Sequence, residues 1–109
     1  MEKITIKQGA TLSLAGLYAL PAGNWSAACN VETPEGAIVT ALACTLTALA
    51  SPDGDGNTHG LLMVATSAQT ALWEVGAPLV SDIKFYNDEV PPQVLKTDTF
   101  GYKVQQAVT

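Results

Sequence analysis

Residues 67–109 read SAQTALWEVGAPLVSDIKFYNDEVPPQVLKTDTFGYKVQQAVT, and their pattern predicts how the fold closes. A short helical turn comes first, followed by a corner from Trp73 to Gly76 and an alternating strand over residues 79–86. A turn with two prolines and a last strand over residues 94–108 follow, with Gly101 as an expected kink. This order is typical of the end of a small β-sandwich, and it leaves no room for a catalytic apparatus.

The helical turn has a defined start and stop. Thr66 is placed as an N-cap, and Gln69 three residues later completes the pattern of a capping box. Gly76 ends the segment, because glycine readily adopts the backbone conformation that terminates helices. The sequence therefore predicts one short helix around residues 67–74.

Alternating segments continue towards the N-terminus, separated by turn-forming residues. Pro and Gly mark the turns near residues 21–24 and 33–36, so the strand at Trp25–Glu32 and the next one should form an antiparallel hairpin. Gly16 interrupts an alternating segment and suggests a bulge or bend. The upstream strands are expected at Lys3–Lys7, residues 11–18, Trp25–Glu32, residues 37–49 and residues 61–65.

Together these segments predict an all-β fold: an Ig-like antiparallel β-sandwich of about seven strands with one short helix. The chain is long enough for a single domain over residues 1–109 with a core of its own. The inward positions expected on two neighbouring strands are Trp25, Ala27, Cys29 and Val31, then Ile38, Leu42, Cys44 and Leu46.

Charge is scarce. Only 14% of residues are charged, about half the usual share, and the net charge is −5 with five lysines and no arginine. Nucleic-acid recognition relies on clustered positive charge and on the arginine fork, so this composition argues against it. A weakly charged surface favours a domain that lies against neighbours in an assembly, with a bland globular surface as the alternative.

Two cysteines and one histidine are too few for a structural zinc site. Cys29 and Cys44 both fall in alternating apolar segments, which favours buried free thiols, with a disulfide between neighbouring strands as the alternative. His59 lies in a turn-rich loop without a nearby nucleophile. The sequence therefore predicts neither catalytic residues nor a cofactor.

The loop DGDGNTH places Asp53, Asp55 and Asn57 at alternate positions, as at the start of an EF-hand calcium loop. The sixth and twelfth positions are Thr58 and Val64, where an EF-hand needs glycine and glutamate. A hairpin loop of turn-forming residues explains the same letters, and a calcium site stays the alternative. Paired carboxylates at Asp82 and residues 88–89 lack the aromatic groove that glycoside hydrolysis needs.

Aromatic residues are the best candidates for contacts with a partner. Trp25 is expected in the core, and Trp73 is placed to plug one end of the sandwich or to act as a contact residue. The tyrosines flank turns or face the polar side of a strand. The interface candidates are Tyr18, Trp73, Tyr86 and Tyr102.

The chain opens with no apolar leader segment and contains no stretch of eighteen apolar residues. We therefore expect a protein that is made in a cytoplasm, without a visible export signal and without a membrane contact.

Three segments resemble a known family. ITIKQGATLSLAGLY at residues 4–18, TSAQTALWEVG at residues 66–76 and LVSDIKFYNDEVPPQVLKTDTFGYKVQQAVT at residues 79–109 look like the small N-terminal domain of tailed-phage baseplate proteins of the upper-baseplate type and of related tail-fibre adaptors. The family pattern comprises a Lys-Gln-Gly-like start, a long first hairpin, a helix before Trp-x-x-Gly, and an Asp-Ile-x-Phe strand. Here the three sequence motifs fall on residues 7–9, 73–76 and 82–85.

The resemblance implies a non-enzymatic structural protein located in the virion, in the tail, collar, baseplate or fibre adaptor. Other virion structural proteins would be its partners, in many copies with trimer or ring symmetry. The lack of arginine and of a following receptor-binding segment favours a free-standing structural subunit. A carbohydrate-binding β-sandwich, aided by calcium at residues 53–57, is the alternative from another class.

Overall fold

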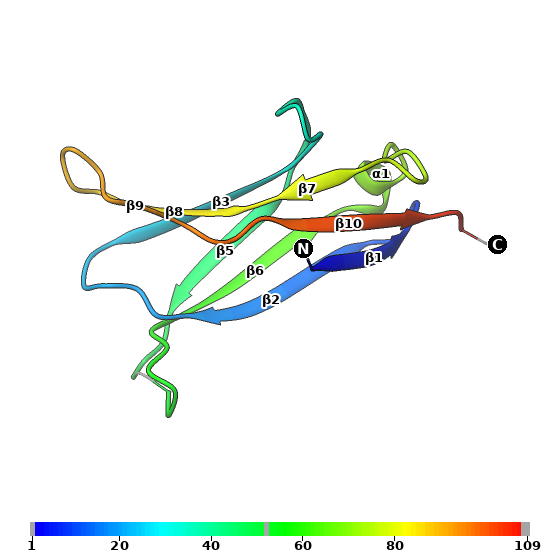
Figure 1. Cartoon of the computed structure of the whole chain (residues 1–109). Coiled ribbons are helices and arrows are strands. Elements are labelled where there is room, and N and C mark those ends of the chain that lie inside the picture. The colour runs from blue at the N-terminus through cyan, green and yellow to red at the C-terminus, as the bar shows by residue number, and fades with distance from the viewer. Residues whose placement is uncertain (1, 52, 108–109) are drawn as a thin grey trace.

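The computed structural model describes residues 2–51 and 53–107, and within them the chain forms ten strands and one short helix packed as two sheets (Figure 1). This architecture confirms the predicted all-β sandwich with its single helix. Val108, the last residue of the predicted final strand, lies outside the described residues.

The larger sheet is built around β3 (Trp25–Glu32). On one edge β3 pairs with β8 (Ile83–Asn87) and β7 (Leu79–Ser81), and on the other with β4 (Ile38–Ala41). β9 (Val94–Lys96) pairs with β8, and β10 (Phe100–Gln105) pairs with β7. β1 (Lys3–Lys7) completes the sheet beside β10.

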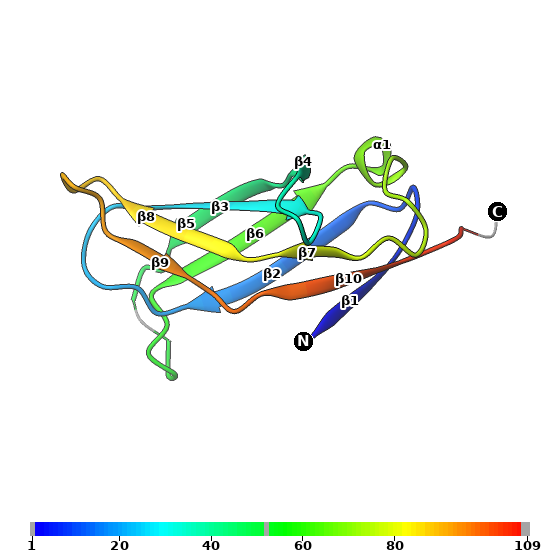
Figure 2. The ribbon, with the colours of Figure 1, turned by 45° about the horizontal axis from the view of Figure 1, so that its top comes forward.

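The smaller sheet has three strands in the order β2 (Leu12–Tyr18), β6 (His59–Ala65) and β5 (Ala43–Ala48). Both pairings in this sheet are antiparallel and regular along their length. Figure 2 shows these strands running beneath the larger sheet, so that the two sheets form the layers of a sandwich.

The topology is Ig-like. β2, β6 and β5 occupy the places of strands B, E and D, while β3, β7–β8 and β9–β10 occupy those of C, F and G. One pairing departs from the predicted antiparallel sandwich, because β1 runs parallel to β10, from Lys3 opposite Gly101 to Lys7 opposite Gln105. The long first hairpin implied by the family resemblance is therefore not formed, since β1 and β2 belong to different sheets.

Three of the seven predicted strands are each divided in two, which accounts for the count of ten. The predicted strand over residues 37–49 is interrupted at Leu42, whose amide donates a hydrogen bond to the carbonyl of Cys29 (2.9 Å). After Leu42 the chain leaves the larger sheet and enters the smaller sheet as β5. Residues 79–86 are interrupted at Asp82, and residues 94–105 at positions 97–99.

The sandwich interior holds one hydrophobic cluster. Members from both sheets include Val31, Ile83 and Phe85 on one side and Leu61 and Met63 on the other. The alternation predicted for β3 is confirmed, with Cys29 and Val31 buried. Ile38 was predicted to point inward, but its side chain is 62% exposed because the pairing register of β3 and β4 shifts between Val31 and Glu32.

Gly16 was expected at a bulge, and this expectation is wrong. It pairs regularly with Leu61 in β2 and β6. The ring of Tyr18 covers it, and a Cβ at this position would lie 3.0 Å from Tyr18 Cε2. Glycine is therefore favoured here by the close approach of an aromatic ring rather than by an irregular backbone.

The helix α1 (Ser67–Thr70) lies between β6 and β7 and is shorter than the predicted 67–74. Its capping box is formed as predicted: the Gln69 amide donates to Thr66 Oγ1 (3.2 Å) and the Thr66 amide donates to Gln69 Oε1 (2.8 Å). Figure 1 shows α1 at the end of the molecule opposite the β8–β9 turn. Within the described ranges, no helix is both long enough and apolar enough to traverse a lipid bilayer.

Candidate protein-interaction face

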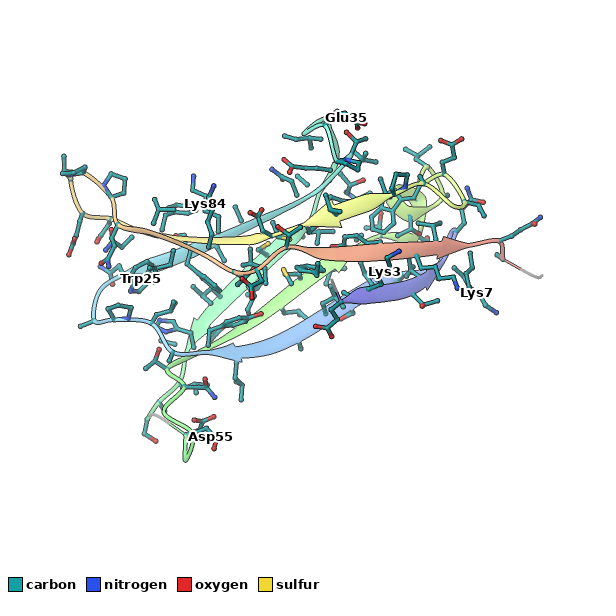
Figure 3. All side chains as sticks on the ribbon, viewed as in Figure 1. Lys3, Lys7, Trp25, Glu35, Asp55 and Lys84 are labelled. Carbon is teal, nitrogen blue, oxygen red and sulfur yellow. The ribbon has the colours of Figure 1, made fainter. Side chains whose placement is uncertain are left out.

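Formal charge is unevenly distributed between the two sheets. β2, β5 and β6 contain no Asp, Glu, Lys or Arg. The larger sheet carries charged side chains on β1, β3, β8, β9 and β10, and Figure 3 labels Lys3, Lys7 and Lys84 among them. The strands of the smaller sheet therefore form a layer of the sandwich without these charged side chains.

The strand register sorts the residues of this layer by face. Leu61 and Met63 are buried in the sandwich interior, whereas Leu17 and Leu62 on the opposite face are 54% and 42% exposed. Three rows of paired residues point outward, and we call them together the uncharged face. They are Ser13–Val64–Ala43, Ala15–Leu62–Thr45 and Leu17–Gly60–Thr47.

A shallow hollow lies in the uncharged face. Gly60 forms its floor because it has no side chain, and Ala15, Leu17, Thr45 and Thr47 line it together with Leu62. An added Cβ at Gly60 would meet only Leu17 Cδ2, at 3.9 Å, so the hollow is open to solvent. A protruding Leu62 and a recessed Gly60 thus stand at neighbouring outward positions of the same strand.

The edges of this sheet are also uncharged. β2 and β5 are its outer strands, and each leaves one row of backbone groups without a partner strand from the same sheet. Natural sheets commonly protect such edges with lysine, proline or a bulge. Neither strand contains a lysine or a proline.

This face was not predicted from the sequence, and the uncharged runs indicate only part of it. Residues 8–31 and 36–52 contain no charged residue, but they supply most of β3 and all of β4 of the larger sheet as well as β2 and β5. The central strand β6 lies outside both runs. Period-two alternation indicates which side chains of a strand point inward, but it does not show which strands share one uncharged outward face.

The predicted interface residues lie in different places. Tyr86 is 37% exposed on β8 of the larger sheet, where Lys84 Nζ lies 5.6 Å from the centre of its ring. Tyr18 points into the sandwich, and its ring centre is 5.0 Å from that of Phe85. Burial raises the pKa of the Tyr18 hydroxyl. These two residues therefore do not form a common surface.

Trp73 and Tyr102 are buried, which corrects their assignment as interface candidates. Trp73 is fully inaccessible and its Nε1 donates to Thr40 Oγ1 (2.8 Å). Tyr102 packs edge-on against Trp73 with ring centres 5.5 Å apart, and its hydroxyl donates to Ser81 Oγ (2.9 Å). Ser81 Oγ donates in turn to the carbonyl of Asn30 (2.7 Å). Satisfied polar atoms allow both rings to be buried.

The loop that suggested calcium uses its carboxylate internally. Asp53 Oδ1 accepts hydrogen bonds from the amides of Asp55 (3.0 Å) and Asn57 (2.8 Å), and Oδ2 accepts one from Asn57 Nδ2 (3.0 Å). The hydrogen bond from the Asn57 side chain is the main cause that lowers the pKa of Asp53. Among residues 2–51 and 53–107, no three His, Cys, Asp or Glu side chains gather as a metal site would require.

Both cysteines are free thiols, as expected. Cys29 on β3 is buried, and Cys44 on β5 is half-buried and packs against the same core. Burial raises the pKa of the Cys29 thiol to about 11, and it also raises the pKa of Cys44. Thiols held protonated are poor nucleophiles, so these side chains act as small core residues.

In sequence comparisons no family model and no curated protein matches the chain.

Proposed function

We propose that the chain is a non-enzymatic structural subunit of a tailed-phage virion that acts through protein–protein contacts. The main observation in support of protein–protein contacts is the uncharged face of the smaller sheet. The phage context is supported by the resemblance of residues 4–18, 66–76 and 79–109 to small baseplate and tail-fibre adaptor domains.

Desolvation favours the uncharged face as a contact surface. A charged side chain at the centre of an interface must lose its water, which costs several kcal/mol unless a partner charge compensates it. The uncharged face avoids this cost, because its exposed atoms belong to Leu17, Leu62, Val64 and to small or hydroxyl-bearing side chains. The centres of protein interfaces are likewise depleted of charge.

The alternative of a carbohydrate-binding module has less support. A sugar platform needs an exposed aromatic face. Trp73 is buried, and Trp25 is held at the turn by a hydrogen bond from its Nε1 to the carbonyl of Pro21 (2.7 Å). The oxygens of Asp53 accept hydrogen bonds from their own loop. We therefore retain the structural subunit as the proposal.

The test is to ask whether the chain is part of a particle. Tailed particles would be purified by density gradient from an induced culture of the bacterium that carries the gene. Quantitative mass spectrometry should find the chain at a fixed ratio to the major tail protein, and immunogold labelling should decorate the tail or baseplate. Absence of the chain from intact particles, with all of it in the soluble fraction, would contradict the proposal.

A glycan array with and without calcium tests the alternative directly. The structural proposal predicts no binding to any glycan at micromolar concentration. Specific calcium-dependent binding would favour the carbohydrate module instead.

A further inference from the structure

We propose that two copies of this chain associate through their uncharged faces, about a two-fold axis that crosses β6 between Gly60 and Leu62. In this arrangement, the Leu62 side chain of each copy occupies the hollow above Gly60 of the other. The inference deepens the proposed function and rests on it for the role of this face as a contact surface; it names the partner as a second copy.

Charge selects the face. Each copy has a net charge of −5, so two copies repel one another through most of their surfaces. Contact through β2, β6 and β5 places no carboxylate or ammonium group of these strands in the interface. An uncharged face does not need a partner of opposite charge. A second copy, which presents the same uncharged face, can therefore bind to it.

Shape sets the axis. Gly60 and Leu62 are successive outward positions on β6, about 6.8 Å apart in an extended strand. Consider a two-fold axis that is parallel to the face, perpendicular to β6 and midway between these two positions. It reverses the direction of β6 in the second copy. Each Leu62 then faces the Gly60 of the other copy, and both contacts form together, as an isologous interface requires.

The spacing of packed sheets is compatible with this contact. Two sheets pack face to face about 10 Å apart, with side chains from both filling the space between them. Leu62 projects from one face, and the missing side chain at Gly60 leaves room for it on the other. The reversal also places the acidic loops of the two copies, which contain Asp53 and Asp55, at opposite ends of the interface.

The size of the face predicts a weak association. Three strands about 4.8 Å apart and five residues long cover only roughly 14 by 17 Å. Stable dimers bury about 800 Å² on each partner, which is more than this face supplies. We therefore expect a dissociation constant on the order of 10⁻⁴ to 10⁻³ M, which becomes effective when neighbouring copies are held together in an assembly.

Sedimentation equilibrium and NMR shift changes, followed from about 20 µM to about 2 mM, would measure the association. The shifts should concentrate at Leu17, Thr45, Gly60 and Leu62. Because two copies of net charge −5 repel one another while the interface itself holds no charge, the dissociation constant should fall as salt rises and screens this repulsion. A chain that stays monomeric over this range, or shifts that concentrate on the larger sheet, would overturn the inference.

Two substitutions with matched exposure locate the interface. Leu62→Asp should abolish dimer formation, since each copy would then bury an uncompensated carboxylate, but only if the faces meet. Val94→Asp is the control, because Val94 on β9 of the larger sheet is also 42% exposed. Equal association of the two variants would contradict the inference.

A complementation experiment tests the axis itself. Gly60→Leu should weaken self-association at least tenfold, because the introduced leucine would collide with Leu62 of the second copy. Leu62→Ala should also weaken self-association, because the hollow above Gly60 of the other copy then stays empty. Mixing the two variants should restore association, since one copy then offers both leucines and the other both hollows. Both should fold, because Gly60 tolerates a Cβ and Leu62 is exposed. Failure of the mixture to exceed either variant alone would reject the proposed axis.

The outcome can be separated from that of the particle experiment. If the chain is found in particles but does not associate through this face, then another virion protein covers the face and only the self-association is wrong. If the chain dimerises as described but is absent from particles, then the proposed function fails and this inference stands.

Discussion

Gly16 and Gly60 are glycines of neighbouring strands in one sheet that differ in what surrounds them. A Cβ at Gly16 would meet Tyr18 Cε2 at 3.0 Å, on the side that faces the core. A Cβ at Gly60 would meet only the end of Leu17, on the solvent side. Neither residue has a positive φ, so alanine is compatible with the backbone at both positions.

This contrast predicts opposite effects of the same substitution. Gly16→Ala should lower the free energy of unfolding by about 1–3 kcal/mol, because the Tyr18 ring must shift within its packing against Phe85. Gly60→Ala should be neutral or stabilising by up to about 1 kcal/mol, since alanine restricts the unfolded chain more than glycine does. Urea unfolding of the two variants would check this, and equal effects would contradict the role of Tyr18.

The buried thiol of Cys29 makes stability depend on alkaline pH. Burial raises its pKa from 9.0 to about 11, so between these values the unfolded chain has lost a proton that the folded protein still binds. The contribution of this thiol to the free energy of unfolding should therefore be constant below about pH 8 and fall as the pH rises from 9 to 11. Urea unfolding at several pH values should show a smaller fall for Cys29→Ala. A residual fall is expected, because burial also raises the pKa of Tyr18 and Tyr102.

At the scale of elements, α1 shows how a four-residue helix is held. Its start is fixed by the reciprocal bonds of Thr66 and Gln69. Its end is tied to the turn after β1, since Thr70 Oγ1 donates to the carbonyl of Ala10 (2.7 Å). A helix this short is not stable by itself, so these contacts and the packing of Trp73 determine its position.

Removing the cap should have a measurable effect on stability. Thr66→Ala should lower the free energy of unfolding by about 1 kcal/mol, since the Gln69 amide loses its acceptor. Thr66→Ser keeps the hydroxyl and serves as the control. In the doubly substituted Thr66→Ala/Gln69→Ala protein the two losses should be less than additive, and full additivity would contradict the capping box.

Elements set by local chemistry were predictable from the sequence, and those set by distant partners were not. The cap at Thr66 and the alternation of Trp25–Glu32 depend on neighbours within a few residues, and both were predicted correctly. The break at Leu42 depends on a hydrogen bond to Cys29 in another strand. The exposure of Ile38 depends on a shift in strand pairing, which the alternation of a single strand does not reveal.

The same distinction applies to the candidate site. That the surface is weakly charged was evident from the composition. The uncharged runs at residues 8–31 and 36–52 do not locate the face, because they also contain β3 and β4 of the larger sheet and leave out β6. The hollow could not be predicted, because it needs Leu17, Gly60 and Thr47 to be placed in one row by the pairing of three strands. Burial of Trp73 and Tyr102 likewise depends on partners at Thr40 and Ser81.

At the scale of the whole molecule, β3 lies at the centre of the larger sheet. It pairs with β8 and β7 along one edge and with β4 from Asn30 to Glu32 on the other, and the smaller sheet covers it. Amide hydrogen exchange should therefore be slowest in β3 and in its neighbours β7 and β8. Exchange should be fastest in β4 and β9, which are short strands, of four and three residues, that pair on one edge only. NMR exchange at neutral pH would check this order, and rapid exchange of the Val31 and Phe85 amides would contradict it.

The parallel pairing of β1 with β10 has a practical consequence for handling the protein. Both the first and the last strand belong to the larger sheet, with Lys3 beside Gly101 and Lys7 beside Gln105 (Figure 1). A tag or tether attached at either terminus therefore leaves the molecule from the layer opposite β2, β6 and β5. A sensor surface coated through either terminus should therefore leave Leu17 and Leu62 of the opposite layer accessible.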